Sequence, residues 1–406
     1  MKCRHCGNEG FIPLADLQNC PPSNAMLTEA ALSAPEIYYP LVVEVCDRCF
    51  LAQVDEHKAA GEIFDSDYTY FSSFSRSWLD HAERFAAMAT DRFELGPHSR
   101  VLEIASNDGY LLQYFLGRGI PVQGVDPTAN TAEVAIGKGI PTIVDFFGRK
   151  LAETRLASSA DLIVGNNVFA HVPDINDFAA GLKVALKPGG VISLEFPHLL
   201  RLIEQSQFDT IYHEHFSYLS LAATERILVA QGLKVFDVEE LATHGGSLRV
   251  FAGHAEGGRE RSPKIDAVLA AEERFGLQDR AVYENFQRRI DRIRADLLGF
   301  LLDQRAAGSK VVGYGAAAKG NTLLNYCGIK GNELVQFVAD LSPHKQGRYL
   351  PGSHIPVVAP ERIEAEKPDF IVIFPWNLRE EIADQLAHAR QWGARFVTAI
   401  PELHIW

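Results

Sequence analysis

Residues 211–220 read IYHEHFSYLS and bring two imidazoles, one carboxylate and two phenols into one short stretch. In an extended segment, Tyr212 and Glu214 would face one side, and His213 and His215 the other. Such a set could ligate a metal, move protons or form an ordinary polar loop. A zinc site through the two histidines lacks an obvious third ligand nearby. The stretch follows the apolar segment VISLEFPH, and ligands of open α/β sheets bind beyond strand carboxyl ends, which favours chemistry.

Four of the six cysteines form two close pairs, Cys3-x-x-Cys6 and Cys46-x-x-Cys49. Two such knuckles can supply four thiolates to one Zn²⁺ ion and leave no open position for water, so the expected zinc is structural. The alternative is four unrelated buried thiols. Cys20 and Cys327 have no such partner and are expected to be ordinary residues.

The composition is that of a globular protein with more than one domain. The chain has 406 residues, of which 47% are hydrophobic and 22% charged, a length that suggests two or three domains. Its net charge of -13 gives no general electrostatic reason to bind nucleic acid or an anionic membrane. The first residues lack the apolar core of a secretory signal, and no segment approaches the roughly 20 apolar residues of a membrane span. We therefore expect a cytoplasmic protein and, without an evident association segment, a monomer.

The elements that must position these residues follow an alternating pattern. From residue 100, apolar runs such as RVLEIAS, PVQGVDP and DLIVGNNV alternate with helical stretches, which predicts a mainly parallel, doubly wound sheet. A charged amphipathic run after residue 255 predicts one or two helices, and a second α/β unit begins at SKVVGYGAAAKG. The expected domains are a zinc-binding domain over 1–65, a nucleotide-binding sheet over 66–258, and a helical linker with the second α/β unit over 259–406.

The segment VLEIASNDGYLL predicts a strand, a turn of small residues and the start of a helix. Glu103 lies on the strand, and Asp126 ends the next strand, where an acid is placed to hydrogen-bond the two hydroxyls of a ribose. The turn lacks the G-x-G-x-x-G that a pyrophosphate needs, which argues against a nicotinamide cofactor. A sheet that binds some other nucleoside remains the alternative.

The segment GYGAAAKG also follows an apparent strand and opens a helix, so main-chain N–H groups and Lys319 could face an anion. About 20 residues later, FVADLSPHKQG places Asp340, His344 and Lys345 at another strand end. The pattern is typical of a nucleotide-diphosphate site, although a simple packing turn would also explain it.

The first turn resembles the first motif of class I S-adenosylmethionine methyltransferases. Taken in order, the cysteine knuckles, LEIASNDGYLL, NNVFAHVPD, YHEHFSYLS and GYGAAAKGNT resemble the three-domain sugar C-methyltransferases of deoxysugar biosynthesis, over nearly the whole chain. Members of that family methylate C3 of a nucleotide-linked 4-keto-6-deoxysugar. The resemblance implies a zinc-binding domain, a Rossmann-like methyltransferase domain and a C-terminal Rossmann-like domain that holds a nucleotide-diphosphate sugar, with dTDP the expected carrier.

The resemblance also assigns roles to individual residues. S-adenosylmethionine would be bound by the first turn, by the strand ends that follow it and by two aromatics that helix packing explains equally well: Glu103, Ala105, Asn107, Gly109, Asp126, Pro127, Asp145, Phe146, Asn166, Asn167, Tyr68 and Tyr70. The sugar nucleotide would be bound in the C-terminal domain by Gly315, Lys319, Asn321, Asp340 and Lys345.

The implied chemistry explains the residues of the opening stretch. A carbon beside a ketone becomes nucleophilic only after it loses a proton, so a base must be aimed at it and the enolate oxygen stabilised. By resemblance His215 is the base, Glu214 and Tyr212 orient it and organise the C4 oxygen, and His171 helps to position the sugar. A methyltransferase of the same scaffold with an oxygen, nitrogen or non-sugar acceptor is one alternative. A noncatalytic zinc-knuckle interaction protein is another, but it would gain little from clustered titratable groups.

Overall fold

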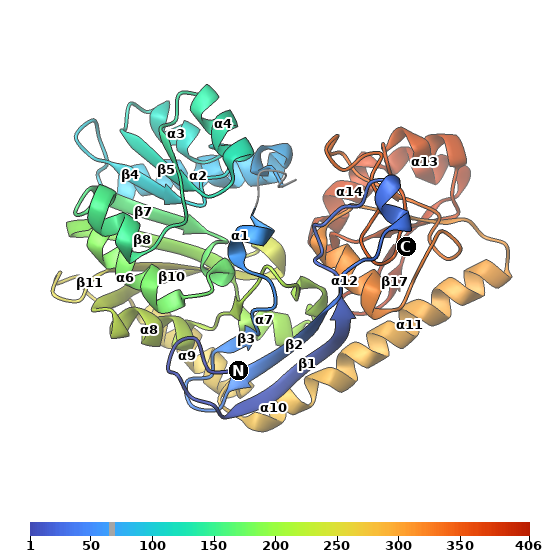
Figure 1. Ribbon diagram of the computed structural model, residues 1–406, viewed down its shortest axis with the longest axis horizontal. Helices are drawn as coiled ribbons and strands as arrows, with labels where there is room; N and C mark the ends of the chain where they lie inside the picture. Colours follow the sequence, from blue (N-terminus) through green and yellow to red (C-terminus); the bar gives the residue numbers. More distant parts are fainter. Residues whose placement is uncertain (65–69) are drawn as a thin grey trace. The chain divides into compact units, whose positions relative to one another are not determined.

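Two α/β sheets organise the chain, as the alternating pattern predicts. The computed structural model describes residues 1–64 and 70–406. They divide into unit 1, which comprises Met1–Phe11, Cys46–Leu200 and His215–Gln278, and unit 2, which comprises Ile12–Val45, Arg201–Glu214 and Asp279–Trp406 (Figure 1). In the part of the chain that is described, no helix is long and apolar enough to cross a membrane.

Unit 1 contains a seven-stranded sheet in the order β10-β11-β8-β7-β4-β5-β6. Neighbouring strands from β8 to β6 are parallel, whereas β11 runs antiparallel to both β8 and β10. The strands are β4 (Val101–Ile104), β5 (Val122–Asp126), β6 (Thr142–Val144), β7 (Ala160–Asn166), β8 (Leu186–Pro197), β10 (Leu233–Leu241) and β11 (Ser247–His254). The expected strands are therefore confirmed, and the sheet is mainly parallel.

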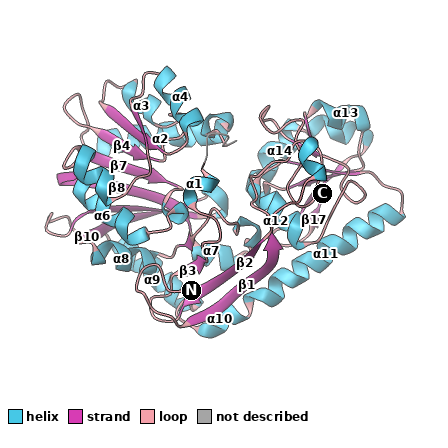
Figure 2. Ribbon diagram, in the orientation of Figure 1, coloured by secondary structure: helices cyan, strands magenta, loops and turns pink. Residues whose placement is uncertain are grey.

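Helices cover both faces of this sheet. Successive residues of a strand point to opposite faces, so each apolar strand contributes to both cores. Val101 packs in the cluster of the helices α2 (Arg76–Arg92), α3 (Leu112–Leu116) and α4 (Ala129–Gly137). Leu102 packs in the cluster of α6 (Ile175–Ala185), α8 (Leu221–Ala230) and α9 (Pro263–Phe275). The apolar runs of the sequence thus fill two cores, and the strands and the helices that pack on them can be followed in Figure 2.

Shorter elements complete unit 1. Strand β3 (Ala52–Val54) pairs antiparallel with β9 (Ser217–Tyr218), directly after the histidine-rich stretch. The remaining short helices are α1 (Ala60–Ile63), η2 (Ser72–Phe74), α5 (Arg149–Leu151), η3 (Ala152–Leu156), η4 (Phe169–His171) and η6 (Thr243–Gly245), while α7 (Leu199–Glu204) starts at the end of unit 1.

Unit 2 contains a six-stranded sheet in the order β14-β13-β12-β15-β16-β17, parallel except for β17. Its strands are β12 (Val311–Tyr314), β13 (Val338–Ala339), β14 (Val357–Val358), β15 (Phe370–Ile373), β16 (Arg395–Thr398) and β17 (His404–Ile405). Its other elements are β1 (Phe11–Cys20), β2 (Tyr39–Cys46), α12 (Ala318–Tyr326), α13 (Glu361–Glu366), α14 (Arg379–Gln385), η1 (Ala30–Ser33), η5 (Phe208–Thr210), η7 (Trp376–Leu378) and η8 (Ala387–Trp392). The expected second α/β unit is confirmed.

The charged run after residue 255 forms three helices rather than the expected one or two. They are α9, α10 (Arg280–Glu284) and the long α11 (Phe286–Ala306). Gly276 ends α9 in the left-handed conformation, with φ 92°, and the Asp279 side chain accepts a hydrogen bond from Ala281 N at the start of α10. These two local signals interrupt an otherwise continuous amphipathic pattern. The boundaries expected for the three domains stay a prediction.

Gly109, in the turn after β4, allows a test of how tightly this turn is packed. Its φ is +77°, and a Cβ would lie 2.5 Å from Ile140 Cδ1. Gly119 has a similar φ of +73° but nothing within 4 Å. We expect Gly119→Ala to lower the free energy of unfolding by about 1 kcal/mol from backbone strain alone. Gly109→Ala should lower it by about 1–3 kcal/mol more, because the methyl also meets the core. Urea denaturation of the two variants measures the difference, and equal losses would contradict tight packing here.

Candidate functional site

The turn between β4 and α3 is fixed by a buried carboxylate. Ala105 and Asn107 have φ of 57° and 48°, a left-handed conformation that needs outside support. Asn107 N donates to Asp126 Oδ2 at 2.8 Å, and Thr128 N donates to Asp126 Oδ1 at 2.9 Å. Asp126 thus binds the main chain of the turn with Oδ2 and the main chain just after its own strand with Oδ1. Its expected contact with a ribose stays a prediction.

The carboxylate of Glu103, unlike that of Asp126, is buried without hydrogen bonds to the described residues. Its side chain is 1% exposed, and neither carboxylate oxygen has a hydrogen-bond partner among the residues that the structure describes. Burial raises the pKa of Glu103 well above its ordinary value. A buried acceptor without a partner calls for a ligand donor or a proton, so this position fits the nitrogen-rich cofactor S-adenosylmethionine.

The ends of β6 and β7 hold the other residues expected at the cofactor. Asn166 ends β7 buried, with its Oδ1 unpaired among the described residues, and Asn167 follows it with φ 54°. Asn167 N donates to Glu195 O at 2.7 Å. Asp145 and Phe146 directly follow β6 and are exposed.

The remaining residues expected at the cofactor lie on the flanking segments. Pro127 is half-buried directly after β5, and the exposed Tyr70 accepts a hydrogen bond at its main-chain oxygen from Asn107 Nδ2 at 3.1 Å. Tyr68 lies outside the described residues.

A buried ion pair at the end of β8 escaped the sequence analysis. Glu195 is fully buried and accepts hydrogen bonds from Arg249 at 2.7 Å and from Thr243 Oγ1 at 2.9 Å, while His81 Nε2 lies 2.9 Å from its Oε2. Burial alone would raise the pKa of Glu195, but the hydrogen bond with His81 and the charge of Arg249 lower it to about 2. Trp78 stacks on His81 with ring centroids 5.0 Å apart. Charged residues inside two apolar strands, VISLEF and LRVFAG, were the signal available in the sequence.

Two imidazoles expected in the active site lie side by side in unit 1. The ring centroids of His171 and His215 are 4.6 Å apart, with an angle of 72° between the ring planes. Tyr218 packs against His215 at 5.9 Å and Phe64 against His171 at 5.8 Å. His171 follows β7 in the helix η4, and His215 is 8% exposed. The fold therefore brings together two residues that are 44 positions apart in the sequence.

Tyr212, His213 and Glu214 belong to unit 2, whereas His215 begins the next part of unit 1. Glu214 is buried and accepts a hydrogen bond from Asn24 Nδ2 at 2.6 Å. His213 Nε2 lies 3.2 Å from the main-chain oxygen of Pro40. The sequence analysis did not single out Asn24, since nothing near it in the chain marks it as functional.

The four paired cysteines form one cluster in unit 1. Each contributes a sulfur, and the four sulfurs lie within 4.8 Å of one another. The Sγ atoms of Cys3 and Cys49 are 3.5 Å apart, and those of Cys6 and Cys46 are 3.6 Å apart. Tetrahedral zinc with Zn–S bonds near 2.3 Å separates its sulfurs by about 3.8 Å. The cluster therefore fits one structural zinc ion. Among the described residues, these four cysteines are the only group of three or more His, Cys, Asp or Glu side chains whose ligand atoms lie close enough to hold a metal ion. A zinc site through His213 and His215 therefore finds no support.

In unit 2 the turn after β12 is held much like the turn in unit 1. Ala316 N donates to Asp340 Oδ2 at 2.7 Å, and Lys345 Nζ donates to Ala316 O at 2.8 Å. Gly315 has φ +88°, and a Cβ there would lie 2.4 Å from Pro375 Cγ. Glycine is thus required at 315, and the predicted residues 315, 340 and 345 do meet at one strand edge.

Helix α12 begins directly after this turn and carries Lys319 and Asn321. Lys319 Nζ donates to Asn377 Oδ1 at 2.7 Å and lies 4.8 Å from the ring centroid of Trp376. Trp376 in turn donates its Nε1–H to Asp209 Oδ2 at 2.8 Å. The Asn321 side chain is 1% exposed, and neither atom of its amide has a partner in the described part of the chain.

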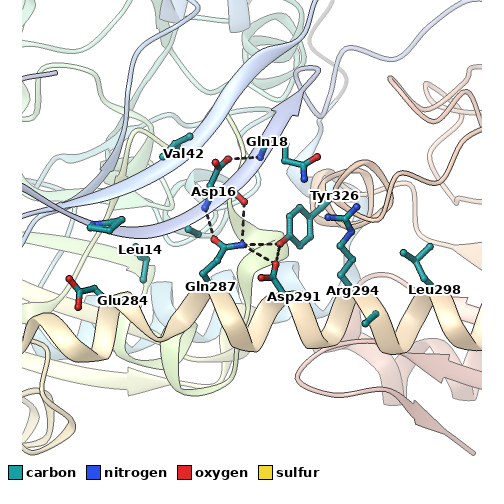
Figure 3. Close-up of a pocket in the computed structure, with 13 residues that line it drawn as sticks. Leu14, Asp16, Gln18, Val42, Glu284, Gln287, Asp291, Arg294, Leu298 and Tyr326 are labelled. Atoms are coloured by element: carbon teal, nitrogen blue, oxygen red, sulfur yellow. Dashed lines mark hydrogen bonds between the residues drawn. The ribbon is translucent and has the colours of Figure 1, made fainter.

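The cavity of about 760 Å³ in unit 2 lies elsewhere, between β1 and α11 (Figure 3). Gln287 Oε1 accepts from Asp16 N at 2.7 Å, and Gln287 Nε2 donates to the hydroxyl of Tyr326 at 2.9 Å. The side chain of Gln287 thus pairs with the main chain of β1. None of the residues expected at a site lines this cavity.

Comparison with known proteins gives three family matches in the expected order. Residues 3–64 match a "Putative zinc binding domain", residues 78–238 a "Methyltransferase domain" and residues 242–401 a "C-methyltransferase C-terminal domain". The order of the matches confirms the expected fold class.

Similar proteins agree with these family matches. The chain is 35% identical to the C-methyltransferase NovU of Streptomyces niveus, over 99% of this chain and 96% of the relative. A ubiquinone biosynthesis O-methyltransferase of Bradyrhizobium is 26% identical over 34% of this chain and 64% of its own length. A solved S-adenosylmethionine-dependent methyltransferase of Clostridium acetobutylicum overlaps 43% of this chain and 92% of its own, with 12% identity and a TM-score of 0.37. That overlap is too loose to define the fold further.

The buried ion pair predicts a pH-dependent loss of stability on mutation. The pKa of Glu195 is near 2 in the folded chain and near 4.5 when exposed, so its charge stabilises the fold fully above about pH 4.5 and the effect is lost as the pH falls toward 2. We expect Glu195→Gln to lower the free energy of unfolding by about 3 kcal/mol at pH 7, because Arg249 loses its buried partner.

Urea denaturation between pH 7 and pH 3 measures the effect, with the exposed Glu83→Gln as the control expected to change stability by less than about 0.5 kcal/mol. The difference between wild type and Glu195→Gln should shrink as the pH falls. A difference that stays constant over this range would show that the charge of Glu195 does not stabilise the fold.

Proposed function

The chain belongs to the S-adenosylmethionine-dependent C-methyltransferases, and we propose that it methylates C3 of a dTDP-linked 4-keto-6-deoxysugar through an enolate. The observation that carries the proposal is the contact between His171 and His215 beside the strand ends of a methyltransferase sheet. Methylation of oxygen does not require loss of a carbon-bound proton, whereas methylation of a carbon beside a ketone does. A pair of adjacent imidazoles, His215 buried and His171 half-buried, supports the carbon reaction.

His215 acts as the base in this proposal. An imidazole titrates near neutral pH and can accept the proton from C3. The electron pair of the C–H bond then moves into the enolate, and the negative charge collects on the C4 oxygen. Because the ring of His215 is buried and flanked by His171 and Tyr218, its orientation is restricted, as a directed proton transfer requires.

Glu214, Tyr212 and His171 support this step. Glu214 is held by Asn24 and would orient the groups around the sugar, while Tyr212 would donate to the C4 oxygen as its charge develops. His171 would help to position the sugar beside His215. When bound, S-adenosylmethionine supplies an electrophilic methyl group. Its proposed contacts are the turn after β4, with the unpaired carboxylate of Glu103 and the buried amide of Asn166.

Unit 2 would hold the nucleotide part of the substrate. Lys345 is 9% exposed, and its ammonium group donates to Ala316 O beside the start of α12. A helix N-terminus with a buried lysine suits a diphosphate. Lys319, on the first turn of the same helix, adds a second positive charge. We propose that the diphosphate lies at this helix start, with Asn321 and Asp340 shaping the turn around it.

Incubation with methyl-labelled cofactor and dTDP-4-keto-6-deoxyglucose derivatives tests the proposal. The expected product carries the label in a new carbon–carbon bond at C3, as NMR of the sugar nucleotide would show. The matched control is the same sugar nucleotide with its ketone reduced to an alcohol, which should receive no methyl group because its C3 proton is not acidic. Label on oxygen or nitrogen, or no transfer to any keto sugar nucleotide, would overturn the proposed reaction.

A further inference from the structure

The segment that leads to the acid–base residues is attached to helix α12 in unit 2. Thr322, on α12, donates from Oγ1 to the main-chain oxygen of Ile211 at 2.9 Å. Thr322 is 1% exposed and Ile211 is fully buried, so this hydrogen bond is shielded from water. Two residues before Ile211, the side chain of Asp209 accepts a hydrogen bond from Nε1–H of Trp376. The main chain before Tyr212 is therefore fixed to α12 and to the loop after β15.

A second set of contacts returns from Glu214 to the same threonine. Asn24 donates to Glu214, and its neighbour Ser23 has its Oγ 3.3 Å from Thr322 Oγ1. Thr322, Ile211, Glu214, Asn24 and Ser23 thus form a closed ring of covalent links and hydrogen bonds within unit 2. Tyr212 is part of the main chain that joins Ile211 to Glu214 in this ring. Thr322 is the member that belongs to α12 and contacts both sides.

Helix α12 also carries Lys319, one of the two lysines proposed to bind the diphosphate. Lys319 is three residues before Thr322, about one helical turn, and the helix begins beside Ala316, which holds Lys345. A helix transmits a shift of one turn to the next with little loss, because its main-chain hydrogen bonds are continuous. The same rigid element therefore meets the nucleotide at one end and the reactive segment one turn later.

On the basis of the proposed function, we infer that Thr322 is a positioning residue that sets Tyr212 and Glu214 in register with the bound sugar nucleotide. Thr322 contacts neither the sugar nor the cofactor in this role. It acts by holding Ile211 and Ser23 at the distance from the helix that the reaction needs.

Replacing Thr322 by valine and by serine tests the inference. Thr322→Val keeps the shape but loses the hydroxyl, so kcat should fall about tenfold while the Kd for dTDP stays within about twofold. Thr322→Ser keeps the hydroxyl and should recover kcat to within about threefold of wild type. Calorimetry with dTDP and the labelled methyl-transfer assay measure the two quantities.

Thr398→Val is the matched control. Thr398 is a fully buried threonine of unit 2 whose hydroxyl has no partner among the described residues, so its loss should leave both kcat and Kd unchanged. Unchanged kcat in Thr322→Val, or a loss of dTDP affinity with kcat retained, would overturn the positioning role. Wild-type protein that binds no dTDP would overturn the proposed function itself, together with the inference that rests on it.

Discussion

In each of the two α/β sheets, the seven-stranded and the six-stranded one, a carboxylate at a strand end binds the main-chain N–H of a neighbouring turn. Asp126 binds Asn107 in this way, and Asp340 binds Ala316. A charge-assisted hydrogen bond away from water is strong, and it holds turns that contain left-handed residues such as Asn107 and Gly315. The proposed ligand contacts of Gly109 and Gly315 depend directly on the geometry of these turns.

The buried charges of unit 1 divide into satisfied and unsatisfied ones. Glu195 has several partners and a pKa near 2, so it is ionised at neutral pH and stabilises the fold. Glu103, on β4 of the same sheet, has no hydrogen-bond partner for its carboxylate in the described residues, and burial raises its pKa. Groups that a fold leaves unpaired in its interior are the ones that a ligand can satisfy. This contrast separates a structural carboxylate from a candidate cofactor contact.

The sequence predicted the parts of the fold that repeat along it. Alternating apolar runs located the strand that carries Glu103 and the strand before Lys319, and cysteine spacing located the cluster of four cysteines, because each pattern is local. The three helices after residue 255 were miscounted because Gly276 and Asp279 act through single-residue caps inside a continuous amphipathic run.

Contacts distant in sequence could not be predicted in the same way. Nothing in the chain pairs Asn24 with Glu214, or Asp209 with Trp376, since these contacts exist only after the sheets have formed. Family resemblance supplied His171 and His215 as active-site residues, and the structure adds that their rings touch. The roles of the individual residues, including the ribose contact of Asp126, stay predictions.

The central claim is that an imidazole removes a carbon-bound proton before the methyl group arrives. The most direct measurement is the exchange of the C3 hydrogen of the keto sugar nucleotide with deuterated water, followed by NMR with the enzyme and S-adenosylhomocysteine, which has no methyl group to give. Wild-type enzyme should wash deuterium into C3, and His215→Asn should abolish the exchange while the exposed His98→Asn retains it. Exchange that proceeds at the wild-type rate in His215→Asn would contradict the account.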